Sequence, residues 1–339
     1  MQGIAVEPVT HWMIENISGA VAPFTFDLIA GGRSNLTFRV TGADGTRYVL
    51  RRPPLGHVLA TAHDMAREHR IISAVGTTGV PVPPCIGLCT DDRVNGAPFY
   101  VMGFVDGVVL DSPARAAALP VELRPTASEH LTDVLADLHA VDVEAVGLGD
   151  LAKREGYIER QVRRWSAQWE NSKTRDLPAI DEVARLLRRH MPAQQGFSIA
   201  HGDYRFGNVL TDVHTGRVAA VLDWELCTLG DPLADLGYLG VYWHRPEWSD
   251  SRDNDPTGAG GFLTYDDIVG RYAARTGRDV SAIDYYVAFG AWRLAVIVEG
   301  VYARYRTGAM GVQDGVDIEW YKLSTETFAV QALDALRRL

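Results

Sequence analysis

The chain has 339 residues, of which 47% are hydrophobic and 22% are charged, and its formal net charge is −10 at pH 7. This length exceeds one ordinary hydrophobic core, so we expect two lobes that share an interface. The acidic excess argues against nucleic-acid binding, which needs a basic surface. We find no uninterrupted apolar run that suits a membrane span, no secretory signal and only three cysteines, so we expect a cytoplasmic protein without a membrane partner.

The N-terminal third predicts a small, mostly antiparallel sheet with one helix. After a short helix at residues 10–17, alternating hydrophobicity and turn signals predict strands at 24–30, 36–40, 47–52, 86–89 and 99–102, and a helix at 63–75. A glycine loop, Gly31-Gly32-Arg33-Ser34-Asn35, separates the first two of these strands. This order of elements is strand, glycine loop, strand, strand, helix.

Beyond residue 107 the pattern becomes mainly helical. Helices are predicted at residues 128–141, 157–170, 180–190, 233–243, 265–276, 281–307 and 318–339, with a short β-rich stretch at 198–223. The predicted fold class is therefore α+β and bilobal. We expect a nucleotide-binding lobe at residues 1–102, a hinge at 103–107, and a catalytic and substrate-binding lobe at 108–339.

The most specific motif is His201-Gly202-Asp203-Tyr204-Arg205-Phe206-Gly207-Asn208, followed by Asp223 at the end of an apolar strand. Phosphoryl transfer needs an acceptor for the proton of the attacking hydroxyl and oxygen ligands for Mg²⁺ on the nucleotide. Asp203 meets the first need, and Asn208 with Asp223 meets the second. A hairpin between Asn208 and Asp223 would bring their side chains together.

Each of these residues also has a purely structural interpretation. The two aspartates could cap turns, and the asparagine could tolerate an unusual backbone angle. The combination of all three residues with the upstream glycine loop favours the catalytic interpretation.

The chain resembles the aminoglycoside phosphotransferase family, which has a protein-kinase-like fold, and within it the subgroup related to the kinase-like domain of some acyl-CoA dehydrogenases. The resemblance covers nearly the whole chain and rests on the His-Gly-Asp block, the glycine loop, Tyr48-Val49-Leu50-Arg51-Arg52, Arg67-Glu68, Asp223-Trp224-Glu225 and Gly230-Asp231-Pro232-Leu233-Ala234-Asp235. It implies that Asp203 is the catalytic base and that Asn208 and Asp223 bind magnesium. His201 and Asp235 are interpreted as structural supports of this loop.

The glycine loop and the sheet supply the expected nucleotide site. Gly32, Ser34 and Asn35 are predicted to approach the phosphates of the nucleotide. Val49 and Met102 are predicted to lie near its adenine ring. Taken alone the loop is weak evidence, since two glycines between strands often form only a turn. The expected nucleotide is ATP, with GTP as the alternative, together with Mg²⁺.

Arg51 is the expected replacement for the lysine that kinases carry on the third strand, because no lysine precedes Lys153. Strand alternation places Arg51 on the same face as Val49 and turns Arg52 to the opposite face. Glu68 is its expected partner. The alternative is a solvated arginine and a surface glutamate.

The acceptor is expected in the helical lobe, where Tyr238, Tyr242, Trp243, Trp292 and Arg293 are candidate wall residues. Aromatic residues at helical spacing also form cores, so each of them has that alternative. The basic C-terminal residues 337–338 favour an apolar or acyl-linked hydroxy compound over an aminoglycoside. A homo-oligomer is left open.

Two functions therefore remain in view. One is an active small-molecule kinase with an alcohol group as acceptor, and the other is a catalytically silent nucleotide-binding or scaffold protein on the same fold. The missing lysine favours the second function, and the presence of the base and both magnesium ligands favours the first.

Overall fold

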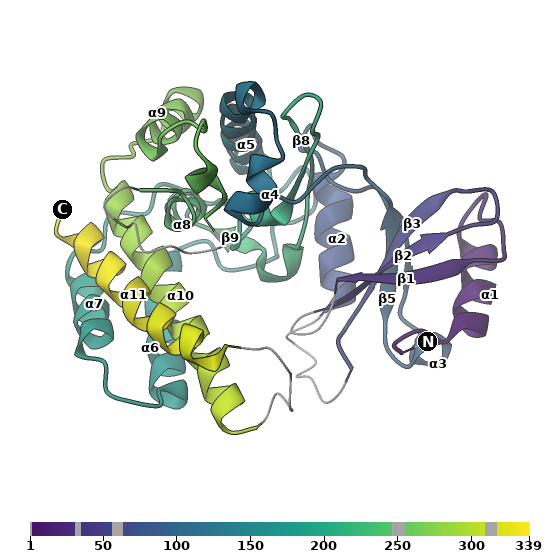
Figure 1. Ribbon diagram of the computed structural model, residues 1–339, viewed down its shortest axis with the longest axis horizontal. Coiled ribbons are helices and arrows are strands. Elements are labelled where there is room, and N and C mark those ends of the chain that lie inside the picture. Colours follow the sequence, from purple (N-terminus) through teal and green to yellow (C-terminus); the bar gives the residue numbers. More distant parts are fainter. Residues whose placement is uncertain (1, 31–34, 56–63, 246–247, 249–254, 309–316) are drawn as a thin grey trace.

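The structure is a computed structural model that describes residues 2–30, 35–55, 64–245, 248, 255–308 and 317–339. A small lobe carries the N-terminus, and the C-terminus lies at the far end of a larger, mainly helical lobe (Figure 1). The small lobe contains a five-stranded antiparallel sheet in the order β1-β2-β3-β5-β4. Its strands are β1 (Thr25–Ala30), β2 (Leu36–Thr41), β3 (Arg47–Arg52), β4 (Cys85–Cys89) and β5 (Phe99–Gly103).

Helices cover both faces of this sheet, and the two longer ones correspond to the helices predicted at residues 10–17 and 63–75. Figure 1 shows α1 (Val6–Asn16) on the outer face and α2 (Met65–Val75) on the face toward the larger lobe, and α3 (Asp92–Asn95) joins β4 to β5. Helix α1 begins four residues before the predicted start, because Pro8 is tolerated in a first turn. Val9 and Met13, one turn apart, anchor it in an apolar core with the sheet. The start of α2 predicted at residue 63 lies outside the described residues.

Between the lobes, the chain runs from β5 through the predicted hinge. Arg47 bonds Asp106 at 2.7 Å, and its guanidinium lies 4.3 Å from the centre of the Phe104 ring. Val108 then exchanges both backbone hydrogen bonds with Thr211, at 2.8 and 2.9 Å. These contacts tie the outgoing segment to both lobes.

The larger lobe contains all seven helices that the sequence predicted. Helix α5 begins at Arg124 rather than Ser128, since Pro125 occupies its first turn. The helices of this lobe are α4 (Pro113–Ala117), α5 (Arg124–His139), α6 (Tyr157–Ser172), α7 (Pro178–Arg189), α8 (Leu233–Val241), α9 (Tyr265–Thr276), α10 (Ile283–Arg306) and α11 (Ile318–Leu336). Two short strand pairs complete it, β6 (Ser198–Ala200) with β9 (Thr228–Gly230) and β7 (Val209–Thr211) with β8 (Val218–Val221).

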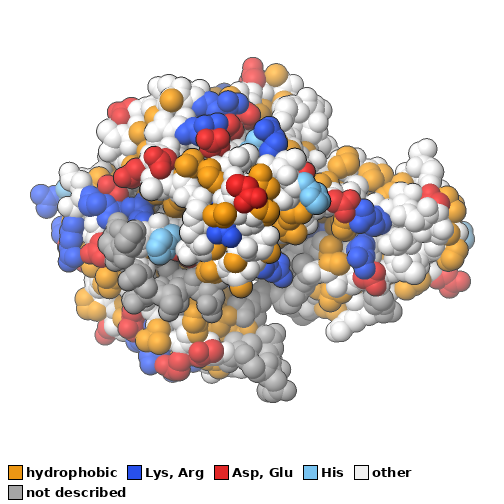
Figure 2. All heavy atoms as spheres, turned by 45° about the horizontal axis from the view of Figure 1, so that its top comes forward, with side chains coloured by type: hydrophobic (Ala, Val, Ile, Leu, Met, Phe, Trp, Pro, Cys, Tyr) orange, Lys and Arg blue, Asp and Glu red, His pale blue; other side chains and the backbone are white. Residues whose placement is uncertain are grey.

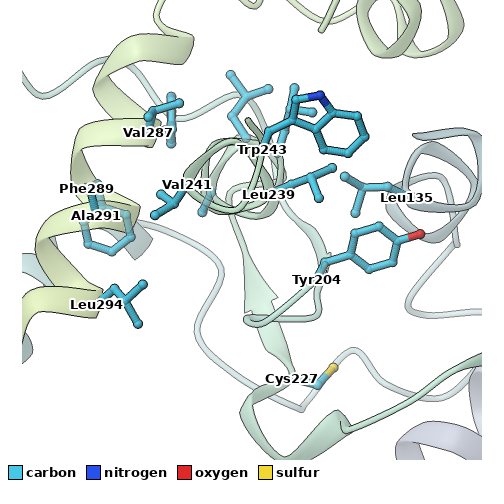
Figure 3. Close-up of a cluster of buried hydrophobic side chains, with 14 of the residues drawn as sticks. Leu135, Tyr204, Cys227, Leu239, Val241, Trp243, Val287, Phe289, Ala291 and Leu294 are labelled. Atoms are coloured by element: carbon cyan, nitrogen blue, oxygen red, sulfur yellow. The ribbon is translucent and has the colours of Figure 1, made fainter. Parts of the chain in front are cut away.

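Helix α10 is the central helix of this lobe. By length and composition it is the one helix among the described residues that could cross a membrane. No apolar run of this kind was predicted from the sequence. In the structure 83% of the apolar window of α10 is buried inside the protein. A core helix of a globular protein has the same properties. Figure 3 shows Val287, Phe289 and Leu294 on α10 among a cluster of buried side chains that includes Leu239 of α8.

On the face shown in Figure 2, basic and acidic side chains lie interspersed over both lobes. The net charge of −10 is therefore not gathered into one acidic patch on this face.

Glycine lets α8 approach α10 closely. A Cβ atom on Gly237 would lie 2.5 Å from Cβ of Tyr286, which is well inside van der Waals contact. Gly270 on α9 has no neighbouring atom within 4 Å of the same position. Close packing therefore requires glycine at position 237, whereas position 270 has room for a larger side chain and provides a control.

We expect Gly237→Ala to destabilise the protein by about 1–3 kcal/mol, because the methyl group forces α8 and α10 apart. Gly270→Ala should stabilise it by up to about 1 kcal/mol, because alanine has the higher helix propensity. Denaturant unfolding measures both. Equal changes in the two variants would contradict this account of the α8–α10 packing.

Candidate active site

The predicted motif forms a loop, residues 201–208, between β6 and β7, which we call the catalytic loop. Strands β7 and β8 pair as a hairpin with Val209 opposite Val221, and the Leu222 N–H donates to the Asn208 carbonyl at 2.8 Å. Asn208 and Asp223 therefore leave adjacent strands, as the sequence predicted. Asp223 is the one non-glycine residue with positive φ in the described chain, at φ 63°. Aspartate is among the few residues that tolerate this conformation.

Asn208 holds Asp203 in place. Its Nδ2 donates to the Asp203 carboxylate at 2.6 Å and to the Asp203 carbonyl at 2.8 Å. Because the amide nitrogen makes both bonds, the amide oxygen points the other way and is the atom left to bind a cation. Arg205 Nε donates to the second carboxylate oxygen of Asp203 at 3.3 Å.

The backbone of the catalytic loop is anchored by a buried carboxylate. Asp235 on α8 accepts the N–H groups of His201 at 2.6 Å and Gly202 at 2.8 Å. His139 Nε2 lies 3.3 Å from the same carboxylate, and its Nδ1 lies 2.7 Å from the Tyr272 hydroxyl. Burial favours the neutral acid, but these hydrogen bonds and the nearby histidines outweigh it and lower the pKa of Asp235. The sequence predicted the role of Asp235 as an anchor but not the contribution of His139 to it.

His201 is also structural, as expected. Its Nδ1 accepts the Asp203 N–H at 3.2 Å, and its Nε2 lies 2.9 Å from the Leu222 carbonyl. This network requires the tautomer with hydrogen on Nε2. Both ring nitrogens of His201 thus link the backbone at Asp203 to the backbone just before Asp223.

Arg51 links the two lobes. Its guanidinium lies 3.1 Å from Glu68, 2.5 Å from Asp223 and 3.8 Å from Glu225, and only 11% of the side chain is exposed. Burial opposes the charge of Arg51, but the surrounding acidic groups outweigh it and raise the pKa. Burial, followed by the charge of Asp223, raises the pKa of Glu225 to about 7. The expected Arg51–Glu68 ion pair is present.

The alternation along β3 is also as predicted. Arg52 points away from Arg51 and donates to the carbonyl groups of Gly3 and Asn95 at 2.7 and 3.1 Å. Val49 lies opposite Met102 in register, and both are almost buried on the Arg51 side of the sheet.

The predicted phosphate loop is covered only in part. Gly32 and Ser34 lie outside the described residues. Asn35 is buried, and its Nδ2 donates to Glu68 at 2.8 Å and more weakly to Glu225 at 3.4 Å. Tyr100 donates to the other Glu68 oxygen at 3.0 Å. These bonds of Asn35 thus support the Glu68 carboxylate, which pairs with Arg51.

Three of the five predicted acceptor residues surround Asp203. The Arg293 guanidinium lies 4.3 Å from the centre of the Tyr238 ring and donates to the Gly202 carbonyl. Arg205 lies 4.8 Å from the ring centre of Tyr242, whose hydroxyl is 3.3 Å from that of Tyr238. Sequence reasoning gave Arg205 no role, although it stands inside the catalytic motif.

The other two predicted acceptor residues, Trp243 and Trp292, make packing contacts away from Asp203. Trp243 is 2% exposed, stacks on Phe206 and donates to the Leu263 carbonyl. Trp292 is fully buried and donates to the Ile180 carbonyl in the first turn of α7. Both side chains occupy packing positions in the structure, and their role as acceptor-wall residues stays a prediction. Helical spacing alone cannot distinguish a core residue from an acceptor-wall residue. Trp292 and Arg293 are adjacent in α10, and their side chains point about 100° apart around the helix.

The donor set suits a magnesium–phosphate site. The described residues contain no group of three or more His, Cys, Asp or Glu side chains that could hold a metal by themselves. Mg²⁺ typically uses one or two protein oxygens and completes its shell with phosphates and water. The carboxylate of Asp223, 28% exposed, and the amide oxygen of Asn208 fit that pattern.

A small antiparallel sheet lobe, a helical lobe and an Asp–Asn–Asp set define a kinase-like phosphotransferase fold. The model of the phosphotransferase enzyme family matches residues 25–273, and the chain belongs to this family. It is 36% identical over 284 residues to acyl-CoA dehydrogenase family member 10 of Mus musculus, a match that covers 82% of this chain and 26% of that protein. The chain thus spans about a quarter of that relative.

Solved structures show the same fold. A protein of Ralstonia eutropha JMP134, provisionally named an aminoglycoside phosphotransferase, is 32% identical with a TM-score of 0.81, and the match covers 98% of each chain. A thermostable variant of an aminoglycoside phosphotransferase, solved with AMP-PNP and hygromycin B, is 16% identical with a TM-score of 0.60 over 95% of this chain and 98% of that one.

We expect Asp235→Asn to destabilise the protein by about 3 kcal/mol, because a buried acceptor of two backbone N–H groups becomes partly a donor. Asp334→Asn, at a surface ion pair with Arg337, should change stability by less than about 0.5 kcal/mol. Unfolding experiments compare the two variants.

The effect of Asp235→Asn should also depend on pH. A lowered folded-state pKa stabilises the protein above the unfolded pKa of about 4, and this stabilisation is lost as the pH falls through the folded value. The difference between wild type and Asp235→Asn should therefore shrink in acid. A difference that is constant with pH would contradict the role of the Asp235 charge.

Proposed function

We propose that the protein is a Mg-ATP-dependent phosphotransferase that moves the γ-phosphate onto a hydroxyl group of a small molecule. The observation that carries this proposal is the arrangement in which Asn208 orients the Asp203 carboxylate while the hairpin sets Asn208 beside Asp223. Membership of the phosphotransferase enzyme family supports the reaction class. Membership of the family does not identify the acceptor.

In the proposed reaction, Asp203 accepts the proton of the acceptor hydroxyl as its oxygen attacks the γ-phosphorus. Asn208 fixes the Asp203 carboxylate through its amide nitrogen, and Asp235 fixes the loop backbone. Mg²⁺, held by Asp223 and the amide oxygen of Asn208, would neutralise phosphate charge. Catalysis in this class consists mainly of positioning and charge stabilisation, which these residues are placed to supply.

Arg51 is the proposed phosphate-binding residue on the small lobe. It lies between Glu68 and Asp223, where the lysine of a kinase would stand. A guanidinium can bind phosphate oxygens with two parallel hydrogen bonds, so arginine is chemically suited to the position. ATP is the proposed nucleotide, in line with the AMP-PNP bound to one distant relative, and GTP is the alternative.

A catalytically silent binding protein is the second candidate, favoured only by the exchange of lysine for arginine. The ion pair of Arg51 with Glu68 weakens that argument, because the arginine makes the contact expected of the lysine. For the acceptor we propose an apolar or acyl-linked hydroxy compound rather than an aminoglycoside.

We expect Asp203→Asn to lower kcat by about 10²–10⁴-fold, because asparagine cannot accept the hydroxyl proton. The KM for ATP should remain within a few-fold of wild type. Mass spectrometry of phosphorylated products from a mixed panel of hydroxy compounds measures turnover, with Asp334→Asn as the surface control. Full activity of Asp203→Asn would exclude Asp203 as the base.

Arg51→Met should raise the KM for ATP by about tenfold or more and lower the melting temperature, since Glu68 is left buried without its cation. Arg51→Lys should retain much more of the ATP affinity, because it restores a charge at this place. Titration with ATP and thermal unfolding report the two effects, and Arg185→Met, at an exposed ion pair of α7, is the control. ATP affinity that is unchanged in Arg51→Met would exclude the phosphate role.

A further inference from the structure

The side of Asp203 that faces α8 and α10 carries two cations. Arg205 Nε contacts the Asp203 carboxylate at 3.3 Å, and Arg293 donates to the carbonyl of Gly202, the residue before the base. Both arginines lie over tyrosine rings, Tyr242 and Tyr238 respectively. These four side chains with Asp203 form a cluster that we call the acceptor-side cluster.

This cluster contains one carboxylate against two guanidinium groups. Among the described groups, the strongest electrostatic neighbours of Arg205 are Asp203 and the two tyrosines, and those of Arg293 are Tyr238, Tyr157 and Asp203. Glu68 and Glu225 lie on the nucleotide side, where they contact Arg51. A neutral phenol does not balance a guanidinium, so within this cluster the two guanidinium groups outnumber the one carboxylate, and the next carboxylate, that of Asp235, is already bonded to the backbone of the catalytic loop.

Arg205 and Arg293 differ in what they can offer a ligand. Arg293 is only 6% exposed, and its Nε has no hydrogen-bond partner in the described chain. The Arg205 side chain is 23% exposed, and the described residues give its terminal nitrogens no hydrogen-bond acceptor. Arg205 is therefore positioned to bind a ligand directly, with Arg293 as a second positive charge behind it.

The acceptor must come close to Arg205. A hydroxyl that gives its proton to Asp203 has to lie within about 3 Å of that carboxylate. Arg205 bonds the same carboxylate, so the atoms next to the reacting hydroxyl fall within reach of its guanidinium. A cationic group at this place would be repelled, and an oxygen anion would be bound by charge-assisted hydrogen bonds.

We propose that the acceptor carries an oxygen anion, a carboxylate or a phosphate, close to its reacting hydroxyl, and that Arg205 binds this anion. The proposal rests on the proposed phosphotransferase function and narrows its acceptor, from an apolar or acyl-linked hydroxy compound to one that carries an anion near the hydroxyl. In the reaction the hydroxyl oxygen forms a bond to the γ-phosphorus, the bond from that phosphorus to the bridging oxygen breaks, the proton passes to Asp203 and ADP leaves. Arg205 takes no part in these bond changes and determines specificity.

The test compares acceptors that share a carbon skeleton. A chain-length series of hydroxy carboxylic acids is assayed with Mg-ATP beside the corresponding methyl esters, amino alcohols and hydroxyalkyl phosphates. We expect kcat/KM for an anionic acceptor to exceed that of its ester and amino alcohol counterparts by at least about tenfold. Preference for the carboxylate or for the phosphate identifies which anion is used, and either preference supports the proposal.

Variants of Arg205 separate binding from a structural role. Arg205→Gln should lower the ratio of kcat/KM between the anionic acceptor and its ester by about tenfold, mainly through KM, while Arg205→Lys restores part of it. If the substitution at Arg205 also disturbs Asp203, kcat/KM falls equally for the anionic acceptor and its ester, and this loss cancels in the ratio. Arg185→Gln is the matched control, and ADP binding followed by thermal shift verifies folding.

Four outcomes overturn the proposal. Esters or amino alcohols used as well as the acids would show that no anion is recognised. An Arg205→Gln variant that loses activity equally on all acceptors would give Arg205 a structural role only. Product from neutral acceptors alone would refute anion recognition and leave the phosphotransferase function intact, whereas no product from any acceptor, with ATP intact, would count against both.

Discussion

The structure depends on one buried cation, the guanidinium of Arg51. It lies at the junction of the sheet, α2 and the segment after β8, and it contacts acidic groups of both lobes at once. Removing a charge from water is costly unless opposite charges and hydrogen bonds replace the water, and here Glu68 and Asp223 do so. Arg67 adds a second link between the same elements, by a 2.5 Å bond to the Cys227 carbonyl. The lobes are thus held in register around the place where the nucleotide phosphates are proposed to bind.

A second buried charge, that of Asp235, sets the catalytic loop. A loop inside a protein has backbone N–H groups that neither water nor a strand partner satisfies, and an unsatisfied group would be costly. Asp235 satisfies two of them from the N-terminal half of α8, and the position of α8 is fixed by its close packing on α10 at Gly237. The geometry around Asp203 is therefore a consequence of core packing, transmitted through one carboxylate.

Much of this could be predicted from the sequence, because it depends on local periodicity. The alternation of β3 separates Arg51 from Arg52, and the hairpin sets Asn208 beside Asp223, as expected. Prediction from the sequence is weakest where three-dimensional packing decides the contacts of a side chain. Trp243 and Trp292 share the helical spacing of acceptor-wall residues, but contacts with other elements bury them. The bonds of His139 and Arg205 also depend on segments distant in the sequence, or on side-chain orientations that no spacing reveals.

Asp203 lies between two environments of opposite charge. On the nucleotide side the acidic groups Asp223, Glu68 and Glu225 gather around Arg51, which suits a site completed by Mg²⁺ and phosphates. On the acceptor side the charges are those of Arg205 and Arg293, with tyrosine rings between them. Residues on the first side are proposed to serve the phosphoryl transfer, whereas those on the second are proposed to face the acceptor. A kinase-like fold can therefore serve different classes of acceptor through the side chains of α8, α10 and one residue of the catalytic loop, without alteration of the groups that are proposed to bind the nucleotide.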